Sequence, residues 1–172
     1  MGFSPVGDRR VDWSNLFDVP GKAPAQRAKP IDGLLPRSLI ELPGAITGVV
    51  DDAAYRSLAA RDLERGEGTG LPSGEAVAQL IGAEVLSEHE LDLARHGWQG
   101  ETPLWLYILR ESSTRHDGDQ LGEVGGRIVA EVLHGVIVSD PESYLSLDPD
   151  WTPTLPARAT HFGLADILVP EH

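Results

Sequence analysis

One face of a predicted helix combines an apolar, an acidic and a basic side chain. Leu58, Asp62 and Arg65 stand at positions i, i+4 and i+7, which places them on one side of a helix. The planar guanidinium of Arg65 is suited to binding a carboxylate, so this face could line the edge of a ligand that carries acidic groups. On the residues alone, an Asp62–Arg65 ion pair on a solvated face, worth about 0.3 kcal/mol, is the favoured interpretation.

The six histidines form no pattern typical of a metal site. His89 and His96 are seven positions apart, so a helix would place them two turns from each other, too far to share one metal ion. His134 falls near the apolar face of a predicted long helix, where packing is the expected role. We therefore predict no metal ligand among them.

Motifs of several common catalytic and nucleotide-binding sites are absent. The chain has no cysteine, which excludes disulfides, thiolate catalysis and cysteine-ligated metals within it. Neither of its two lysines follows a phosphate-binding loop, and no GxSxG nucleophile motif occurs. The stretch GEGTG at 66–70 lacks the third glycine of a dinucleotide-binding loop. Composition alone leaves a Ser-His-Asp triad open.

The chain of 172 residues is strongly acidic. Fourteen lysines and arginines against 27 aspartates and glutamates give a net charge of 14 − 27 = −13, which repels phosphate backbones and anionic lipid headgroups. We therefore expect no nucleic-acid partner. No apolar run approaches the ~18 residues of a membrane span, and the N-terminal residues do not resemble a signal peptide. A cytoplasmic location is expected.

Capping signals and apolar spacing predict an all-α fold without strands. Residues 1–45 contain six prolines and are expected to form an extended arm with one short helical turn near Trp13. Residues 46–172 are expected to form a single helical domain. Ser73, and a capping box of Ser87 with Glu90, mark two helix starts. Helices are predicted over residues 51–66, 74–81, 87–97, 104–112, 121–139, 141–148 and 160–168.

Four stretches of the chain carry a resemblance to a known family. They are SLAARDLERGEGTGLP at 57–72, GETPLWLYILRE at 100–111, LGEVGGRIVAEV at 121–132 and DPESYL at 140–145. The first resembles the N-x-x-R-G-R-D-H-G-[LI]-P signature of animal-type haem peroxidases, the superfamily of the mammalian peroxidases and cyclooxygenases. The other three resemble the C-terminal part of its bacterial branch, in matching order and spacing. The resemblance covers roughly residues 10–168.

The resemblance implies roles for three residues of the first stretch. In the family, the signature asparagine accepts a hydrogen bond from the proximal histidine, and the arginine three positions later binds a haem propionate. These positions are Asp62 and Arg65 here, and Leu58 would form part of the pocket wall. The departure is aspartate in place of asparagine. Because a carboxylate is the stronger acceptor, Asp62 should lower the reduction potential of the iron.

The resemblance also implies a split enzyme. The family's distal histidine, distal arginine and proximal histidine all precede the matched region, and the first histidine here is His89. We therefore expect no catalytic residue in this chain, which would share a haem with a companion polypeptide that carries the N-terminal peroxidase half. The complex would oxidise a small-molecule substrate. The alternatives are a non-catalytic scaffold or regulatory module derived from the same fold, and a fragment of a longer peroxidase.

A subunit of this kind should expose apolar helix surfaces to its companion. The candidates for such surfaces are Trp105, Tyr107 and Ile108 on one predicted helix, and Val124, Ile128, Val132 and Val136 on another. Packing within the chain accounts for them equally well at the level of sequence.

Overall fold

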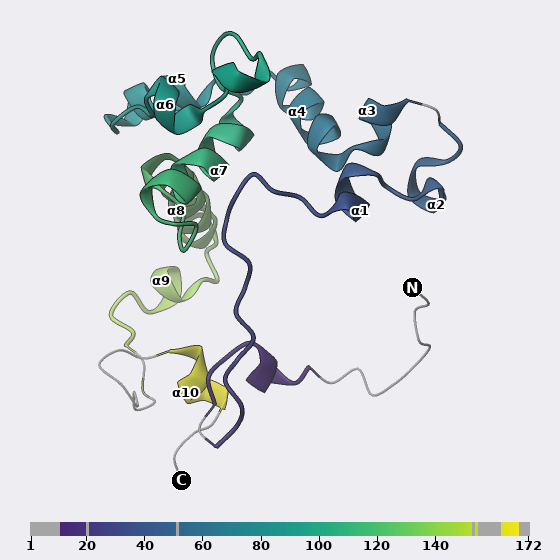
Figure 1. The fold of residues 1–172 in the computed structure, drawn as a ribbon. Coiled ribbons are helices and arrows are strands. Elements are labelled where there is room, and N and C mark those ends of the chain that lie inside the picture. The colour runs from purple at the N-terminus through teal and green to yellow at the C-terminus, as the bar shows by residue number, and fades with distance from the viewer. Residues whose placement is uncertain (1–10, 20, 51, 153, 155–162, 169–172) are drawn as a thin grey trace. The chain divides into compact units, whose positions relative to one another are not determined.

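The computed structural model describes residues 11–19, 21–50, 52–152, 154 and 163–168. These residues belong to two compact units, of which one is Pro30–Ser139 and the other contains the described residues before Pro30 and after Ser139. Helices and loops account for the described chain (Figure 1), which contains no strand and only an isolated bridge between Ser73 and Pro103. The predicted mainly helical fold is confirmed.

The unit Pro30–Ser139 holds the longer helices. Its elements are α1 (Arg37–Ile40), α2 (Gly44–Thr47), α3 (Ala53–Arg56), α4 (Leu58–Gly68), α5 (Gly74–Ile81), α6 (Glu88–Leu91), the 3-10 turn η2 (Ala94–His96), α7 (Leu104–Arg115) and α8 (Glu123–Ser139). Helix α7 packs against α4, α5, α6 and α8, so it is the central element of this unit (Figure 1).

The other unit contains short elements: η1 (Trp13–Asn15), α9 (Tyr144–Leu147) and α10 (Leu164–Leu168). The Asp12 carboxylate caps η1 by accepting the Ser14 N–H at 3.1 Å. The helical turn predicted near Trp13 is thereby confirmed. A T-shaped contact between the rings of Tyr144 and Trp151, 5.8 Å apart, packs the segment around α9.

A small core joins α5, α6, α7 and α8. Its buried apolar side chains are Ala78, Leu86, Leu91, Tyr107 and Val124. The Tyr107 hydroxyl accepts the Leu86 N–H at 2.8 Å, so the largest buried side chain is also satisfied at its polar end. Burial raises the pKa of this phenol. A Cβ at Gly74 would overlap the Tyr107 ring, so only glycine allows α5 to approach α7 this closely.

Hydrogen bonds between distant residues fix the start of α7. The Glu75 carboxylate accepts the Thr102 N–H at 2.9 Å and the Thr102 hydroxyl at 2.6 Å. The Gly74 N–H donates to the Thr102 carbonyl at 2.9 Å. The start of α5 and the start of α7 are therefore held side by side.

Two of the predicted helices are interrupted. The helix predicted over 51–66 divides at Ser57, whose hydroxyl caps α4 by accepting the Ala60 N–H, and α4 passes Gly66 to end at Gly68. The helix predicted over 87–97 begins with the expected capping box but ends after one turn, because Asp92 adopts a left-handed φ of 54°.

Other predicted bounds move by a few residues. Helix α7 extends three residues past Ser112 to Arg115, and α8 begins at Glu123 instead of 121. Helix α9 begins at Tyr144 instead of 141, because residues 141–143 form a turn. Of the helix predicted over 160–168, residues 160–162 lie outside the described residues and α10 begins at Leu164.

Candidate functional site

A cavity of about 810 Å³ opens between α4 and the start of α7. Three segments line it: α4 from Asp62 to Glu67, the turn Thr69–Ser73, and residues between Trp98 and Trp105. All of them belong to the unit Pro30–Ser139. The Glu75–Thr102 hydrogen bonds hold the third segment beside the start of α5, so hydrogen bonds between distant residues fix this wall of the cavity.

Asp62 and Arg65 both line this cavity. They lie on consecutive turns of α4, with the Arg65 Nη2 3.6 Å from the Asp62 Oδ1. The Asp62 side chain is 25% exposed and the Arg65 side chain is 68% exposed. The ion pair that the residues alone favoured is therefore present, and the guanidinium still presents donors to the cavity.

Leu58 lies outside the lining of the cavity. It is the first residue of α4 and is half-buried, one helical turn before Asp62. Of the three residues that the resemblance implicates, the structure thus brings Asp62 and Arg65 to the cavity and leaves Leu58 beyond its edge.

Most of the cavity lining was not predicted from the sequence. Leu71 is 54% exposed, Trp98 46% and Trp105 55%, so an apolar wall is open to solvent. The Trp98 indole N–H donates to the Glu101 carbonyl at 3.2 Å, which fixes the ring beside the start of α7. Glu64, Glu67 and Glu101 add carboxylates. Two sequence features could have indicated this lining: the repeated Glu and Gly of the stretch 64–70, and the isolated tryptophans that follow it.

The lining suits only part of a haem group. Arg65 could hold a haem carboxylate, and the indoles of Trp98 and Trp105 offer apolar surface. However, no described residue that lines the cavity is a histidine, cysteine, methionine or tyrosine, the side chains that ligate haem iron. The cavity therefore fits the edge of a haem and holds no ligand for its iron.

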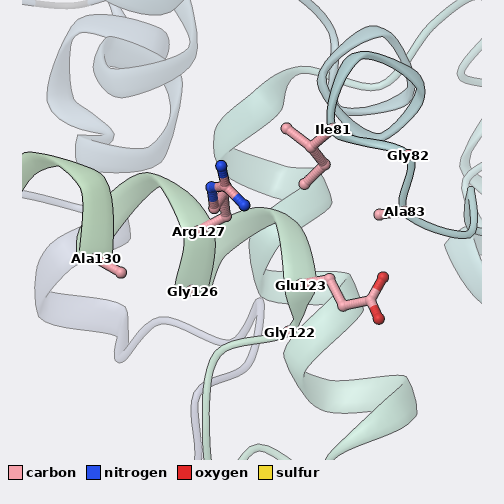
Figure 2. A pocket seen from close by; sticks show the side chains of 8 residues that line it. All are labelled: Ile81, Gly82, Ala83, Gly122, Glu123, Gly126, Arg127 and Ala130. Atoms are coloured by element: carbon pink, nitrogen blue, oxygen red, sulfur yellow. The ribbon is translucent and has the colours of Figure 1, made fainter.

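A second, shallower hollow of about 510 Å³ lies between the end of α5 and the first turns of α8. Figure 2 shows Ile81, Gly82 and Ala83 on one side and Glu123 and Arg127 on the other. Arg127 is already paired with Glu131 on its own helix. Glycines and alanines make up most of the lining of this hollow, and the carboxylate of Glu123 has no hydrogen-bond or ion-pair partner among the described residues.

Glu90 and Arg115 form a partly buried ion pair, with side chains 28% and 22% exposed. The Arg115 Nε donates to Glu90 at 2.9 Å, and its Nη1 donates to the Glu84 carbonyl at 2.9 Å. Hydrogen bonds from Arg115, and then from the Ser87 N–H and hydroxyl, lower the pKa of Glu90 to about 2. Arg115 thereby ties α7 to α6 and to the loop before it, away from the cavity lining.

The described residues contain no group of three or more histidine, aspartate or glutamate side chains arranged to hold a metal ion. No helix within them is long and apolar enough to cross a membrane.

Comparisons with protein-family models, with curated proteins and with solved structures find no match to this chain.

Proposed function

We propose that this chain forms part of the haem pocket of a two-chain enzyme related to animal-type haem peroxidases. The observation that carries the proposal is that Asp62 and Arg65, the two positions that match the family signature, line one cavity. The companion polypeptide would supply the iron ligand and the residues that activate peroxide. Bound haem would supply the oxidising chemistry, which acts on a small-molecule substrate.

Arg65 is the proposed contact for a haem carboxylate. Its side chain is 68% exposed, and its ion pair with Asp62 is long at 3.6 Å. A guanidinium that makes one weak contact keeps most of its donors for a ligand. A carboxylate at this position would form charge-assisted hydrogen bonds, worth roughly 1.5–3 kcal/mol.

Asp62 is the proposed acceptor for a histidine of the companion. It is three-quarters shielded and lies one turn before Arg65 on the same face. A carboxylate that accepts the N–H of an iron-ligating imidazole makes that ligand more basic. Asp62 would thus tune the iron without touching it, as a positioning residue.

The proposal is tested by haem retention. We would produce the chain alone and together with the polypeptide encoded next to it, add hemin, and record the Soret absorption. Arg65→Ala should weaken haem binding by the two-chain complex about tenfold or more, which corresponds to ~1.4 kcal/mol. Arg61→Ala is the matched control, because Arg61 lies on the same helix outside the lining and its guanidinium stacks over Tyr55 at 5.2 Å.

Two results would contradict the proposal. One is the absence of a Soret band both from the chain alone and from the two-chain preparation. The other is equal haem affinity of the Arg65→Ala and wild-type complexes. If haem is retained, Asp62→Asn should raise the reduction potential of the iron, a readout that a merely structural role would leave unchanged.

One observation favours the alternative of a non-catalytic interaction module. Val129, Val132, Leu133 and Val136 follow the i, i+3, i+4, i+7 spacing of one helix face, and each is 45–63% exposed. An exposed apolar stripe of this kind marks a protein interface. Under this alternative the chain binds a companion, and substitutions at Asp62 and Arg65 leave both the complex and its spectrum unchanged.

A further inference from the structure

The cavity beside α4 carries an excess of negative charge. Four carboxylates line it, those of Asp62, Glu64, Glu67 and Glu101, against the single guanidinium of Arg65. The balance of the lining is 1 − 4 = −3. Within the described part of the chain, no ion pair or side-chain hydrogen bond compensates the three glutamates. A haem carboxylate at Arg65 would make this balance more negative.

The same cavity presents apolar surface that attracts cations. The Trp98 and Trp105 side chains are about half-exposed, and their indole faces carry the negative end of the ring quadrupole. The volume of about 810 Å³ lies within the roughly 300–1,000 Å³ of pockets that enclose a sizeable ligand. Indole faces next to uncompensated carboxylates therefore favour an occupant that is both apolar and positively charged.

We propose that a basic segment of the companion polypeptide, with arginine or lysine side chains between apolar ones, docks into this cavity. The inference rests on the proposed function for the existence of a companion. The proposed haem contact uses Asp62 and Arg65, and the docking segment would use the remaining carboxylates and the two indoles. Charge complementarity of this kind steers association and selects the partner. It also gives a role to the strongly acidic character of the chain, whose net charge is −13.

Peptide binding to the full chain tests the inference. The probe is a synthetic twelve-residue peptide of alternating arginine and leucine, and its binding is measured by titration calorimetry. The salt concentration is about 0.15 M, at which exposed charges more than ~8 Å apart are largely screened. We expect saturable one-to-one binding. The triple variant Glu64→Gln/Glu67→Gln/Glu101→Gln should bind at least tenfold more weakly. Trp105→Ala, at a side chain that is 55% exposed, should also weaken binding several-fold.

The matched control removes the same number of charges elsewhere. Glu88→Gln/Glu142→Gln/Asp150→Asn changes three exposed carboxylates outside the cavity and should alter the affinity less than twofold. Equal losses in the two triple variants would overturn the inference, because they would show attraction by net charge alone. Equal binding of a glutamate–leucine peptide would overturn it as well.

The outcome is separable from that of the proposed function. The peptide titration contains no haem, so a failure of the chain to retain haem would leave its result unaffected. Conversely, if the two-chain complex retains haem and the chain does not bind the basic peptide, the docking inference alone is overturned.

Discussion

The carboxylate of Glu111 on α7 accepts the backbone N–H of Val124 on α8, with both oxygens at 3.1 Å. Glu111 is 1% exposed, and its Oε2 also accepts the Gly125 N–H at 3.3 Å. The first amides of a helix have no partner within the helix itself, and here a side chain from a neighbouring helix provides it. A Cβ at Gly122 would overlap this carboxylate, so the turn before α8 requires glycine at this position.

Removal of the Glu111 carboxylate should therefore destabilise the unit strongly. Glu111→Ala leaves two buried N–H groups without an acceptor and opens a cavity, and we expect a loss of about 3 kcal/mol in the free energy of unfolding. Glu111→Gln keeps one acceptor oxygen and should cost about half as much. Urea unfolding followed by circular dichroism measures both. Glu123→Gln is the control, since Glu123 begins the same helix but is exposed, and it should change stability by less than ~0.5 kcal/mol.

Two glycine-to-alanine substitutions should have opposite effects. At Gly74 the added methyl group would overlap the Tyr107 ring in the core, so Gly74→Ala should cost at least ~2 kcal/mol. At Gly68, the last residue of α4, nothing lies within 4 Å of the added atom. There, alanine should stabilise by up to about 1 kcal/mol, because glycine is the poorer helix former. Thermal unfolding of the two variants compares them directly, and stabilisation by Gly74→Ala would contradict the packing described here.

Features fixed by neighbouring residues are readable from the sequence, whereas features fixed by tertiary contacts are not. The capping box of Ser87 and Glu90 was predictable because both partners lie within one turn. The break at Asp92 was not, since a non-glycine residue with positive φ leaves no periodic pattern. Similarly, Pro103 is the N-cap of α7, and no side chain caps that helix, although a threonine precedes the proline. Thr102 instead bonds to Glu75, a partner 27 positions away that apolar spacing does not reveal.

In the candidate site, too, local spacing predicts some residues and tertiary packing places the others. Asp62 and Arg65 share a helix face, and their i,i+3 relationship was readable from spacing alone. The opposite wall, with Trp98 and Trp105, is placed by packing of α7 against α4 and by the bonds at Thr102. No local pattern specifies such a juxtaposition, so the sequence predicted one side of the cavity only.

Stability should fall with acid through the titration of Glu90. The Arg115 guanidinium and Ser87 hold the pKa of Glu90 at about 2, against an ordinary value of 4.5. A lowered pKa in the folded state stabilises the fold above the unfolded value, and this stabilisation is lost as the pH falls from about 5 towards 2. Glu90→Gln should cost about 1.5 kcal/mol at pH 7, as expected for hydrogen bonds to charged groups, and flatten the acid limb.

Urea unfolding at a series of pH values between 7 and 2 measures this effect. The free energies of wild type and Glu90→Gln should converge towards pH 2. Glu84→Gln is the control: its carboxylate lies 3.9 Å from the same Arg115 but is 86% exposed, so the acid limb should stay as in the wild type. An identical pH dependence in wild type and Glu90→Gln would show that another group governs the acid limb.

The pair Asp62 and Arg65 should contribute little to folding. Their atoms are 3.6 Å apart and the arginine is two-thirds exposed, and ion pairs of this kind contribute about 0.3–0.5 kcal/mol. Arg65→Ala and Asp62→Asn should therefore change the free energy of unfolding by less than ~0.5 kcal/mol, as measured by urea unfolding at pH 7. A larger loss would mean that any accompanying loss of ligand or partner binding reflects misfolding. With stability unchanged, a loss of binding in either variant is attributable to the cavity that these two side chains line.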